Sequence, residues 1–208
     1  MAARTVDVEA RTASVMEAAA TIFAQRGYNA ATIEEIAHAA GIGKGTTYEY
    51  FPSKQELFLA VIDHDWRRLV EAHDEPSGGP DRTTMDRLDA LTTAVLESYQ
   101  EIQRLHPAAM EFLVSSGAPD CCRRLMRSFR DGLAIFRDRA AHIIDAGMAR
   151  GEVRGDLPTQ VIATVLIGAL EGLVLQGRTD PSLRPQELWK PFLSVVARGM
   201  EPRSALAP

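Results

Sequence analysis

A run of 23 residues, TIEEIAHAAGIGKGTTYEYFPSK (32–54), constrains the fold more than any other part of the chain. Thr32 and Glu35 have the spacing of a capping box, in which a hydroxyl and a carboxylate satisfy free backbone amides at a helix start. The apolar residues that recur at helical spacing are Ile33, Ile36, Ala37 and Ala40. Gly41 follows where a tight turn needs a positive φ, which glycine adopts at little cost. The run therefore begins with a short helix that ends in a glycine turn.

A second short helix is expected after this turn, from about Lys44 to Phe51. Pro52 ends it, because proline has no amide hydrogen and restricts the residue before it. Ser53 and Glu56 repeat the capping-box spacing and open a longer helix. The inward residues of that helix are Leu57, Phe58, Val61, Ile62, Trp66, Leu69 and Val70. Two short helices joined by a tight turn predict a helix-turn-helix, whose second helix enters the major groove of DNA.

The stretch from about Val15 to Val61 carries a dense set of residues that are typical of one known family. Those that precede the second short helix are Ala18, Ala19, Phe23, Gly27, Tyr28, Thr32, Ile33, Ile36, Ala37, Ala40 and Gly41. Those that follow are Gly45, Thr46, Tyr48, Tyr50, Phe51, Ser53, Lys54 and Leu57. On these residues the chain resembles the TetR/AcrR family of bacterial transcriptional regulators. It departs from the family pattern at three positions. Ala31 stands where the family usually has threonine, Gly43 where it has serine, and Thr47 where it has leucine.

The rest of the chain also shows helical periodicity, and no segment alternates like a strand. A first helix is expected from about Thr12 to Gln25, and a Pro- and Gly-rich loop covers 74–81. Further helices are expected over about 85–102, 107–113, 119–150, 158–175 and 185–200. We therefore expect an all-α fold. The resemblance implies an N-terminal three-helix DNA-binding domain (1–54) and a C-terminal helical ligand-binding and dimerisation domain (55–208).

The charge of the chain is unusual for a protein that binds DNA. The net charge is −5, and residues 1–54 carry five Lys and Arg against six Asp and Glu, a balance of about −1. DNA-binding domains usually show a basic surface. Phosphates can instead be held by backbone amides at helix starts, by hydroxyl groups and by a few cations. We therefore expect modest affinity for non-specific DNA and a shallow salt dependence.

The resemblance and the groove geometry select a set of candidates for DNA contact. They are Thr32, Lys44, Gly45, Thr46, Thr47, Tyr48, Tyr50 and Lys54. Lys44, Gly45 and Thr46 are expected near the start of the recognition helix, where bases are read. Lys44 is expected to donate to guanine, and the methyl group of Thr46 or Thr47 is expected to contact a thymine methyl group. The alternative for Thr47 is a hydroxyl buried beneath the recognition helix.

The matching family positions imply that Tyr48, Tyr50 and Lys54 mainly hold phosphates and so fix the register of the protein on DNA. The alternative for Tyr48 is packing in the small core of the three-helix domain. Phe51 is expected in that core. Specific binding that survives the loss of Tyr50 and Lys54 would contradict this assignment.

A small-molecule site in the C-terminal half is implied chiefly by the resemblance. Its candidates are large side chains and one histidine, namely Trp66, Tyr99, His106, Met110, Phe112, Phe129, Leu133 and Phe136. The alternative for each apolar residue is ordinary helical core. One face of the helix over 119–150 also carries Arg123, Arg127, Arg130 and Arg137. A solvated face is the favoured interpretation, and a site for an anionic head group is the alternative.

The last two helices supply the candidate dimer interface. The segment 161–175 is apolar almost all round, so it needs cover on more than one side. The resemblance implies that the last two helices pair with their copies in a homodimer, and the alternative is that they form the core of one protomer. The candidate interface residues are Val161, Val165, Gly168, Gly172, Leu188, Trp189, Phe192 and Val196.

Several other classes of protein are disfavoured. The sequence lacks a glycine-rich phosphate loop after a strand, a paired metal-ligand spacing and a nucleophile–histidine signature, so no enzyme, metal site or cofactor is expected. No long apolar run follows the N-terminal charges, and 161–175 is too short to span a bilayer, so a cytoplasmic location is expected. Cys121 and Cys122 are expected to be reduced thiols, with a redox switch as the alternative.

These observations lead to one predicted function. The chain is expected to be a ligand-responsive, homodimeric repressor that binds a palindromic operator in double-stranded DNA and is released by a small apolar or amphipathic effector. Repression rather than activation is implied by the resemblance alone. The effector is expected to shift the helix that begins at Ser53, which directly follows the recognition helix. The alternative is a helical small-molecule-binding module with weak or lost DNA binding.

Overall fold

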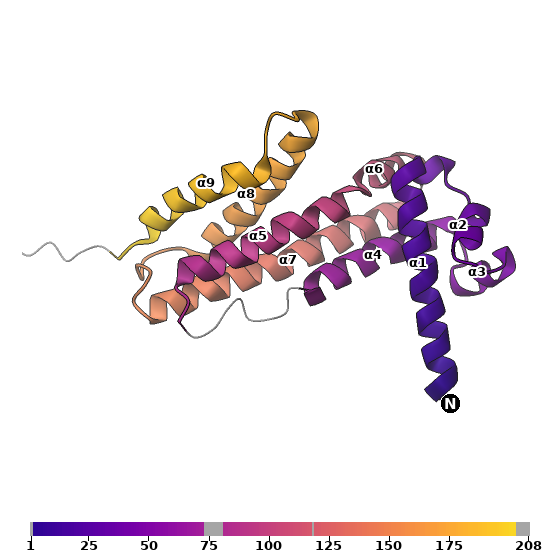
Figure 1. Cartoon of the computed structure of the whole chain (residues 1–208), viewed down its shortest axis with the longest axis horizontal. Helices are drawn as coiled ribbons and strands as arrows, with labels where there is room; N and C mark the ends of the chain where they lie inside the picture. Colours follow the sequence, from indigo (N-terminus) through magenta and orange to yellow (C-terminus); the bar gives the residue numbers. More distant parts are fainter. Residues whose placement is uncertain (1, 73–80, 118, 203–208) are drawn as a thin grey trace, which may run out of the picture. The chain divides into compact units, whose positions relative to one another are not determined.

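The structure is a computed structural model that describes residues 2–72, 81–117 and 119–202, and the side chains of these residues apart from 2–9 and 98–102. All regular structure in these ranges is helical, which confirms the predicted all-α fold (Figure 1). The helices are α1 (Ala2–Ala30), α2 (Ile33–Ala39), α3 (Lys44–Tyr50), α4 (Lys54–Ala72), α5 (Thr84–Gln103), α6 (His106–Ser115), α7 (Pro119–Ala149), α8 (Thr159–Thr179) and α9 (Pro185–Met200). Most bounds agree closely with those expected, but α1 begins well before Thr12 and extends to Ala30 across Gly27, whose backbone is not helical, and α8 continues to Thr179.

Two compact units share these helices. Among the described residues, the first contains those up to 68 together with 101–130, and the second contains 69–100 together with those from 131 onward. The first unit thus holds α1, α2, α3, most of α4, α6 and the first part of α7. The second holds most of α5, the rest of α7, α8 and α9. A functional boundary after residue 54 stays a prediction.

An aromatic cluster forms part of the core of the first unit. Phe23 and Tyr28 of α1 stack with ring centroids 5.9 Å apart, and Phe58 of α4 meets Phe23 edge-on at 5.0 Å. Phe112 of α6 lies 5.0 Å from both Tyr28 and Phe58. Offset and edge-on pairs of this kind are the favourable arrangements of aromatic rings. Through them α6 packs against the helices of the N-terminal domain.

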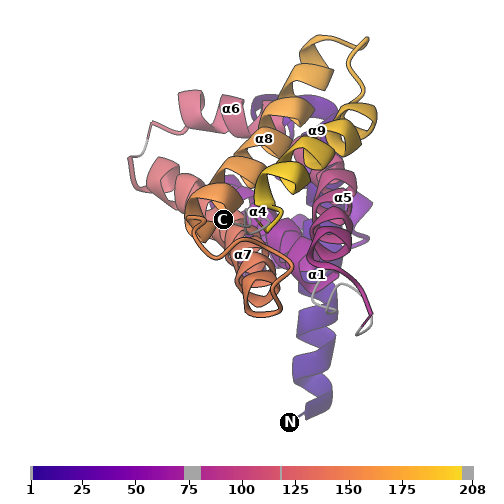
Figure 2. The same cartoon turned by 90° about the vertical axis from the view of Figure 1, so that its left-hand side faces the viewer.

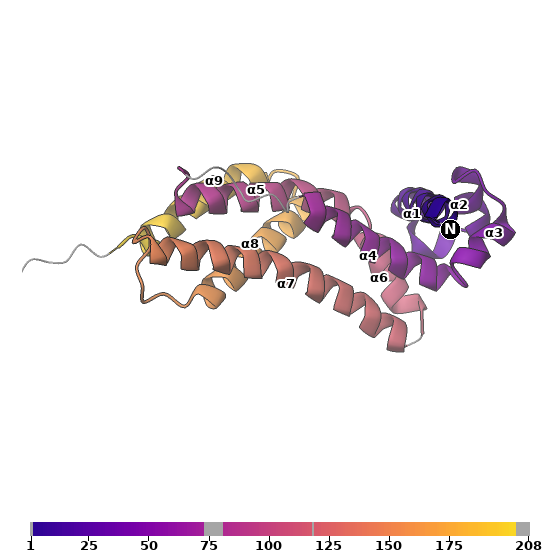
Figure 3. The same cartoon turned by 90° about the horizontal axis from the view of Figure 1, so that it is seen from below.

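The predicted helix-turn-helix lies in the first unit, and Figure 3 shows α2 and α3 beside α1. Both halves of its capping box form, since the Glu35 amide donates to Thr32 Oγ1 at 3.2 Å and the Thr32 amide donates to Glu35 Oε2 at 3.1 Å. Gly41 has a φ of 69°, and the Ile42 amide donates to the Ala37 carbonyl at 3.0 Å across the turn. The turn therefore requires glycine for its conformation.

A buried hydrogen bond joins α5 to α9 in the second unit. Trp189 Nε1 donates to Thr92 Oγ1 at 2.8 Å, and the Thr92 hydroxyl donates to the Leu88 carbonyl at 2.6 Å. Both the tryptophan and the threonine are buried. This placement corrects the assignment of Trp189 to the dimer interface. A buried indole needs an acceptor for its N–H, and Thr92 supplies one inside the protomer.

The start of α5 is held by the segment that follows α7. The Glu152 carboxylate accepts from the Thr84 amide at 2.6 Å, from the Thr84 hydroxyl at 2.7 Å and from Arg150 Nε at 2.5 Å. These bonds, that from Arg150 first, lower the pKa of Glu152 to about 2. Glu152 thus satisfies a free amide at the start of a helix to which it does not belong.

Candidate nucleic-acid interface

The first turns of α3 present an exposed face. Lys44 and Gly45 are exposed, and a Cβ added at Gly45 would meet nothing within 4 Å. Tyr48 is 45% exposed, while Thr46 and Tyr50 are half-buried. Thr32, at the start of α2, is also exposed, although its hydroxyl is engaged in the capping box. These placements leave polar groups available to a groove, with room at Gly45 for close approach.

Thr47 lies on the inner face of α3. Its side chain is fully buried, and its hydroxyl donates to the Gly43 carbonyl at 3.4 Å. A buried hydroxyl needs a partner, and the carbonyl one helical turn earlier provides it. Thr47 therefore packs beneath the recognition helix. Its predicted contact with a thymine methyl group does not fit this structure.

Lys54, predicted to hold a phosphate, is turned toward the end of α1. Its Nζ donates to the carbonyl oxygens of Tyr28 at 2.9 Å, Asn29 at 3.2 Å and Ala31 at 3.0 Å. Burial lowers the pKa of Lys54, and the negative charge of Glu111 opposes that shift. An ammonium group has three N–H donors, and these contacts employ all of them. In this structure Lys54 caps the end of α1, and these bonds compete with the predicted contact to phosphate.

The same junction between α1 and α2 is also held by α6. Glu111 Oε2 accepts from the Asn29 amide at 2.8 Å. At Gly27, where φ is 77°, an added Cβ would fall 2.3 Å from Glu111 Oε1. Glycine is thus required there both for the backbone conformation and for the space that the carboxylate fills. Sequence reasoning missed Glu111, because no local pattern relates residues 82 positions apart.

The cations beside the recognition helix are paired with carboxylates. Lys44 Nζ lies 3.4 Å from Glu34 Oε2, and Arg26 Nη1 lies 3.1 Å from Glu35 Oε1. The hydrogen bonds from Thr32, followed by the charge of Arg26, lower the pKa of Glu35, so this carboxylate is ionised at neutral pH. Exposed pairs contribute little to stability. They do cancel the positive charge that a DNA-binding surface usually carries.

Two polar contacts join α4 to α7 within the first unit. Arg124 donates to both carboxylate oxygens of Glu56, at 2.6 and 3.0 Å, and Ser128 donates to Asp63 at 2.5 Å. At the start of α4, the Glu56 amide donates to Ser53 Oγ at 3.1 Å. The hydroxyl half of the second predicted capping box therefore forms, while the Glu56 carboxylate is directed at Arg124. The hydrogen bond from Arg124 lowers the pKa of Glu56.

The residues predicted for a ligand site are divided between the two units. In the first unit Trp66 is buried, and its ring meets that of Phe129 edge-on at 5.9 Å. Phe112 belongs instead to the aromatic cluster, where Tyr28 and Phe58 enclose it. That packing corrects its assignment as a ligand residue, because a fully buried ring in a filled core offers no surface to a ligand.

The remaining ligand candidates differ in exposure. Met110 is exposed, while His106 and Leu133 are half-buried. Phe136, in the second unit, is fully buried. Tyr99 lies outside the side chains that the structure describes. Assignment to a ligand site stays a prediction for Trp66, His106, Met110, Phe129, Leu133 and Phe136.

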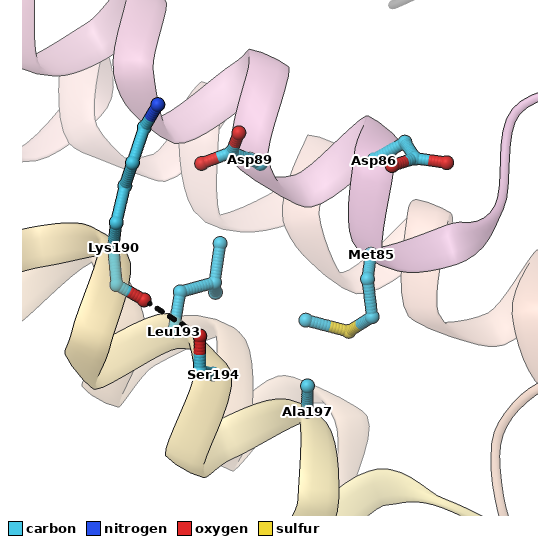
Figure 4. A pocket seen from close by; sticks show the side chains of 7 residues that line it. All are labelled: Met85, Asp86, Asp89, Lys190, Leu193, Ser194 and Ala197. Atoms are coloured by element: carbon cyan, nitrogen blue, oxygen red, sulfur yellow. Dashed lines mark hydrogen bonds between the residues drawn. The ribbon is translucent and has the colours of Figure 1, made fainter.

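A groove of about 260 Å³ lies between α5 and α9 in the second unit. Figure 4 shows its lining, which consists of Met85, Asp86, Asp89, Lys190, Leu193, Ser194 and Ala197. None of these residues is a predicted ligand residue. Asp86 is already engaged, since it accepts from the Thr83 amide at 3.0 Å and from the Thr83 hydroxyl at 2.7 Å. The groove is smaller than most small-molecule sites.

An exposed apolar stripe runs along α8 and α9, which lie side by side (Figure 2). Its large exposed side chains are Val161, Val165, Leu175, Leu188, Phe192 and Val195. Gly168 and Gly172 fall on the same face of α8, and a Cβ at either would meet nothing within 4 Å. Val196 is half-buried. Apart from Trp189 and Val196, every predicted interface residue thus lies on this stripe.

The stripe leaves α8 poorly covered within one protomer. Only 28% of its most apolar window, with a mean hydropathy of 1.6, is buried. The 21-residue helix is longer than the segment expected from the sequence, and by length and composition alone it could cross a membrane. Core helices of soluble proteins also meet that criterion, so it is weak evidence for a membrane span.

The arginines and cysteines at the start of α7 are partly engaged. Arg123 pairs with Asp120 of its own helix, and Arg124 pairs with Glu56 of α4. Cys121 and Cys122 are half-buried free thiols, and Cys122 Sγ lies 3.3 Å from the Ser116 hydroxyl. In the described part of the chain, no group of three or more His, Cys, Asp and Glu side chains is placed to hold a metal ion.

Comparisons with known proteins agree with this architecture. Residues 15–61 match the model of a family described as bacterial regulatory proteins, tetR family. Over 202 residues the chain is 28% identical to the HTH-type transcriptional repressor KstR2 of Rhodococcus jostii, and the match covers 91% of each chain. Among solved structures, a TetR transcription regulator from Haloarcula marismortui superposes with a TM-score of 0.76 at 22% identity, over 93% of this chain and 99% of that one.

A second solved structure adds a bound ligand to the comparison. The regulator FadR of Bacillus subtilis, in complex with stearoyl-CoA, has a TM-score of 0.66 at 17% identity, over 90% of this chain and 98% of that one. At this identity the likeness shows the fold alone. The matched residues, the helix-turn-helix and the shared helical fold together confirm the predicted resemblance to the TetR family of transcriptional regulators, whose model matches residues 15–61.

Proposed function

We propose that this regulator is a homodimeric repressor that binds a palindromic operator and is released by a small apolar or amphipathic effector. The observation that carries the proposal is the combination of two exposed surfaces, the first turns of α3 and the apolar stripe of α8 and α9. The first offers polar groups to a DNA groove, and the second offers apolar area that a second copy covers. A two-fold dimer then presents two recognition helices to two half-sites.

The proposals of a repressor role, a cytoplasmic location and an apolar effector are supported by the relatives and by the chemistry of the candidate side chains. KstR2 is named a repressor, and FadR was solved with stearoyl-CoA. The candidate residues Trp66, Phe129 and Leu133 are apolar and so favour an apolar or amphipathic molecule. DNA in a bacterium lies in the cytoplasm, and we place the protein there. A thermal-shift series that compares an acyl-CoA with its free acid tests whether the arginine face of α7 binds the anionic head group of a ligand.

Selection from a random duplex library at moderate salt tests the DNA-binding part of the proposal. Recovery of one palindromic sequence is the expected result, and its two half-sites would indicate that the protein binds DNA as a dimer. Lys44→Met is expected to weaken binding to that sequence, because the exposed ammonium lies at the start of α3. Lys190→Met on α9 is the matched control and should bind normally. No enrichment from effector-free protein would favour the alternative of a small-molecule-binding module without DNA binding.

The dimer has its own test. Val195 is 68% exposed on the apolar stripe, whereas the adjacent Ser194 is exposed toward the groove beside α5. Val195→Lys puts a charge into the proposed interface, where it would be desolvated without a partner. Sedimentation equilibrium should show a shift toward monomer for this variant. Ser194→Lys adds the same charge off the stripe and should stay dimeric, so equal behaviour of the two variants would remove the stripe from the interface.

A further inference from the structure

The two capping boxes of the first unit differ in where their carboxylates point. In α2 the Glu35 carboxylate turns back and accepts from the Thr32 amide at 3.1 Å. In α4 the same spacing joins Ser53 to Glu56, and the Glu56 amide donates to Ser53 Oγ. The Glu56 carboxylate, however, accepts from Arg124 on both oxygens. A residue of α7 thus occupies the carboxylate that would otherwise close the cap of α4.

We propose that Arg124 is a positioning residue for the recognition helix and that it acts through Glu56. The Glu56 carboxylate has two positions, one on the guanidinium of Arg124 and one on the Ser53 amide. In the first position the carboxylate joins the first turn of α4 to α7 through Arg124. In the second it accepts from the Ser53 amide and completes the capping box of α4. The inference rests on the proposed function, since it assigns a route by which a movement of α7 reaches the DNA-reading helix.

The chain places this carboxylate close to the DNA-reading element. α3 ends at Tyr50, and only Phe51, Pro52 and Ser53 separate it from α4. Phe51 is buried in the first unit, so a change in the first turn of α4 is transmitted to the end of α3 rather than absorbed by a long loop. A shift in the position of Glu56 therefore changes the orientation of α3.

The two positions of the Glu56 carboxylate differ by a small free energy, so the binding of a ligand can shift the equilibrium between them. The side chains of Arg124 and Glu56 are 47% and 39% exposed, and exposed ion pairs contribute modestly. A completed cap is also a modest interaction. Asp63, which lies near Arg124 and accepts from Ser128, adds negative charge that retains the guanidinium beside α4. A ligand that binds better when α7 is displaced from α4 would release Glu56 to Ser53.

Hydrogen exchange at the Ser53 amide in the full-length protein without DNA tests the two positions. Arg124→Ala should slow that exchange by roughly threefold or more, because the freed carboxylate then accepts from the amide. Arg123→Ala is the matched control, since Arg123 pairs within its own helix, and it should leave the exchange unchanged. In a Glu56→Ala background, Arg124→Ala should give no slowing. Unchanged or faster exchange in Arg124→Ala, as for an ordinary structural ion pair, would overturn the proposal.

Affinity for the selected operator supplies the second measurement. Arg124→Ala should bind it roughly two- to fivefold more weakly than Arg123→Ala does, the size of effect that an exposed ion pair has. Slower Ser53 exchange with equal operator affinity in the two variants would overturn the positioning role. If the wild-type protein binds no operator, the proposed function fails, and the exchange measurement alone still supports or overturns the two positions of Glu56.

Discussion

Substitution of Lys54 by methionine removes an ammonium group that donates to the carbonyls of Tyr28, Asn29 and Ala31. Methionine retains most of the apolar stem, so the change isolates these hydrogen bonds. A hydrogen bond from a charged donor contributes about 1.5–3 kcal/mol. Of the three acceptor residues Asn29 is exposed, whereas Tyr28 and Ala31 are buried, so water replaces the ammonium mainly at the Asn29 carbonyl. We therefore expect a net loss of about 1–2 kcal/mol, or about 2–8 °C in melting temperature for a chain of this size.

The salt dependence of operator binding separates a cap from a phosphate contact. Each phosphate that a cation neutralises adds about 0.9 to the slope of log affinity against log salt concentration. Lys54→Met should lower the melting temperature and leave this slope unchanged. Lys44→Met, whose ammonium is exposed beside Glu34, is the matched control and should melt normally while binding more weakly. A Lys54→Met protein that melts like wild type and loses about 0.9 in slope per subunit would refute the reasoning.

Three further changes test other contacts. Thr92→Val leaves the buried Trp189 N–H without its acceptor and should cost about 1–3 kcal/mol in urea unfolding; an equal cost in a Trp189→Phe background would contradict this. Gly27→Ala forces a φ of 77° on alanine and displaces the Glu111 carboxylate, so it should cost about 1–3 kcal/mol, and less in a Glu111→Ala background. Glu152→Gln should be less stable than wild type at neutral pH, and the difference should shrink as pH falls from 4.5 to about 2, because the folded pKa lies below the unfolded value. A difference that persists unchanged through that window would argue against the carboxylate's role.

The parts of the fold that could be predicted from the sequence depend on neighbouring residues. Thr32 and Glu35 are one helical turn apart, and Gly41 marks its own turn, so both features are visible in a short window. Helical periodicity likewise located α4 to α9, because each apolar stripe repeats along a single element. These features depend on residues a few positions apart, so they can be predicted without knowledge of the tertiary contacts.

The parts that could not be predicted depend on partners far along the chain. Glu111 meets the Asn29 amide across 82 positions, and Arg124 meets Glu56 across 68. The apolar residues of α9 occupy two faces, so periodicity alone did not tell the inward Trp189 from the outward Phe192. The position of Thr47, buried or facing DNA, was left open for a similar reason. A helix of seven residues has too few turns for a pattern to distinguish its inner face from its outer one.

The carboxylates that match Lys44 and Arg26 also affect how copies of this protein distribute along a chromosome. A genome offers about 10⁶–10⁹ competing sites, and a strongly basic regulator is held on them by phosphate attraction alone. A DNA-binding protein whose lysine and arginine side chains are already paired with carboxylates binds non-specific DNA less, so more of its copies are free in solution. If the chain binds an operator as proposed, we expect a small number of molecules per cell to keep it occupied, and we expect that occupancy to change little when the cell's internal ion concentration rises under osmotic stress.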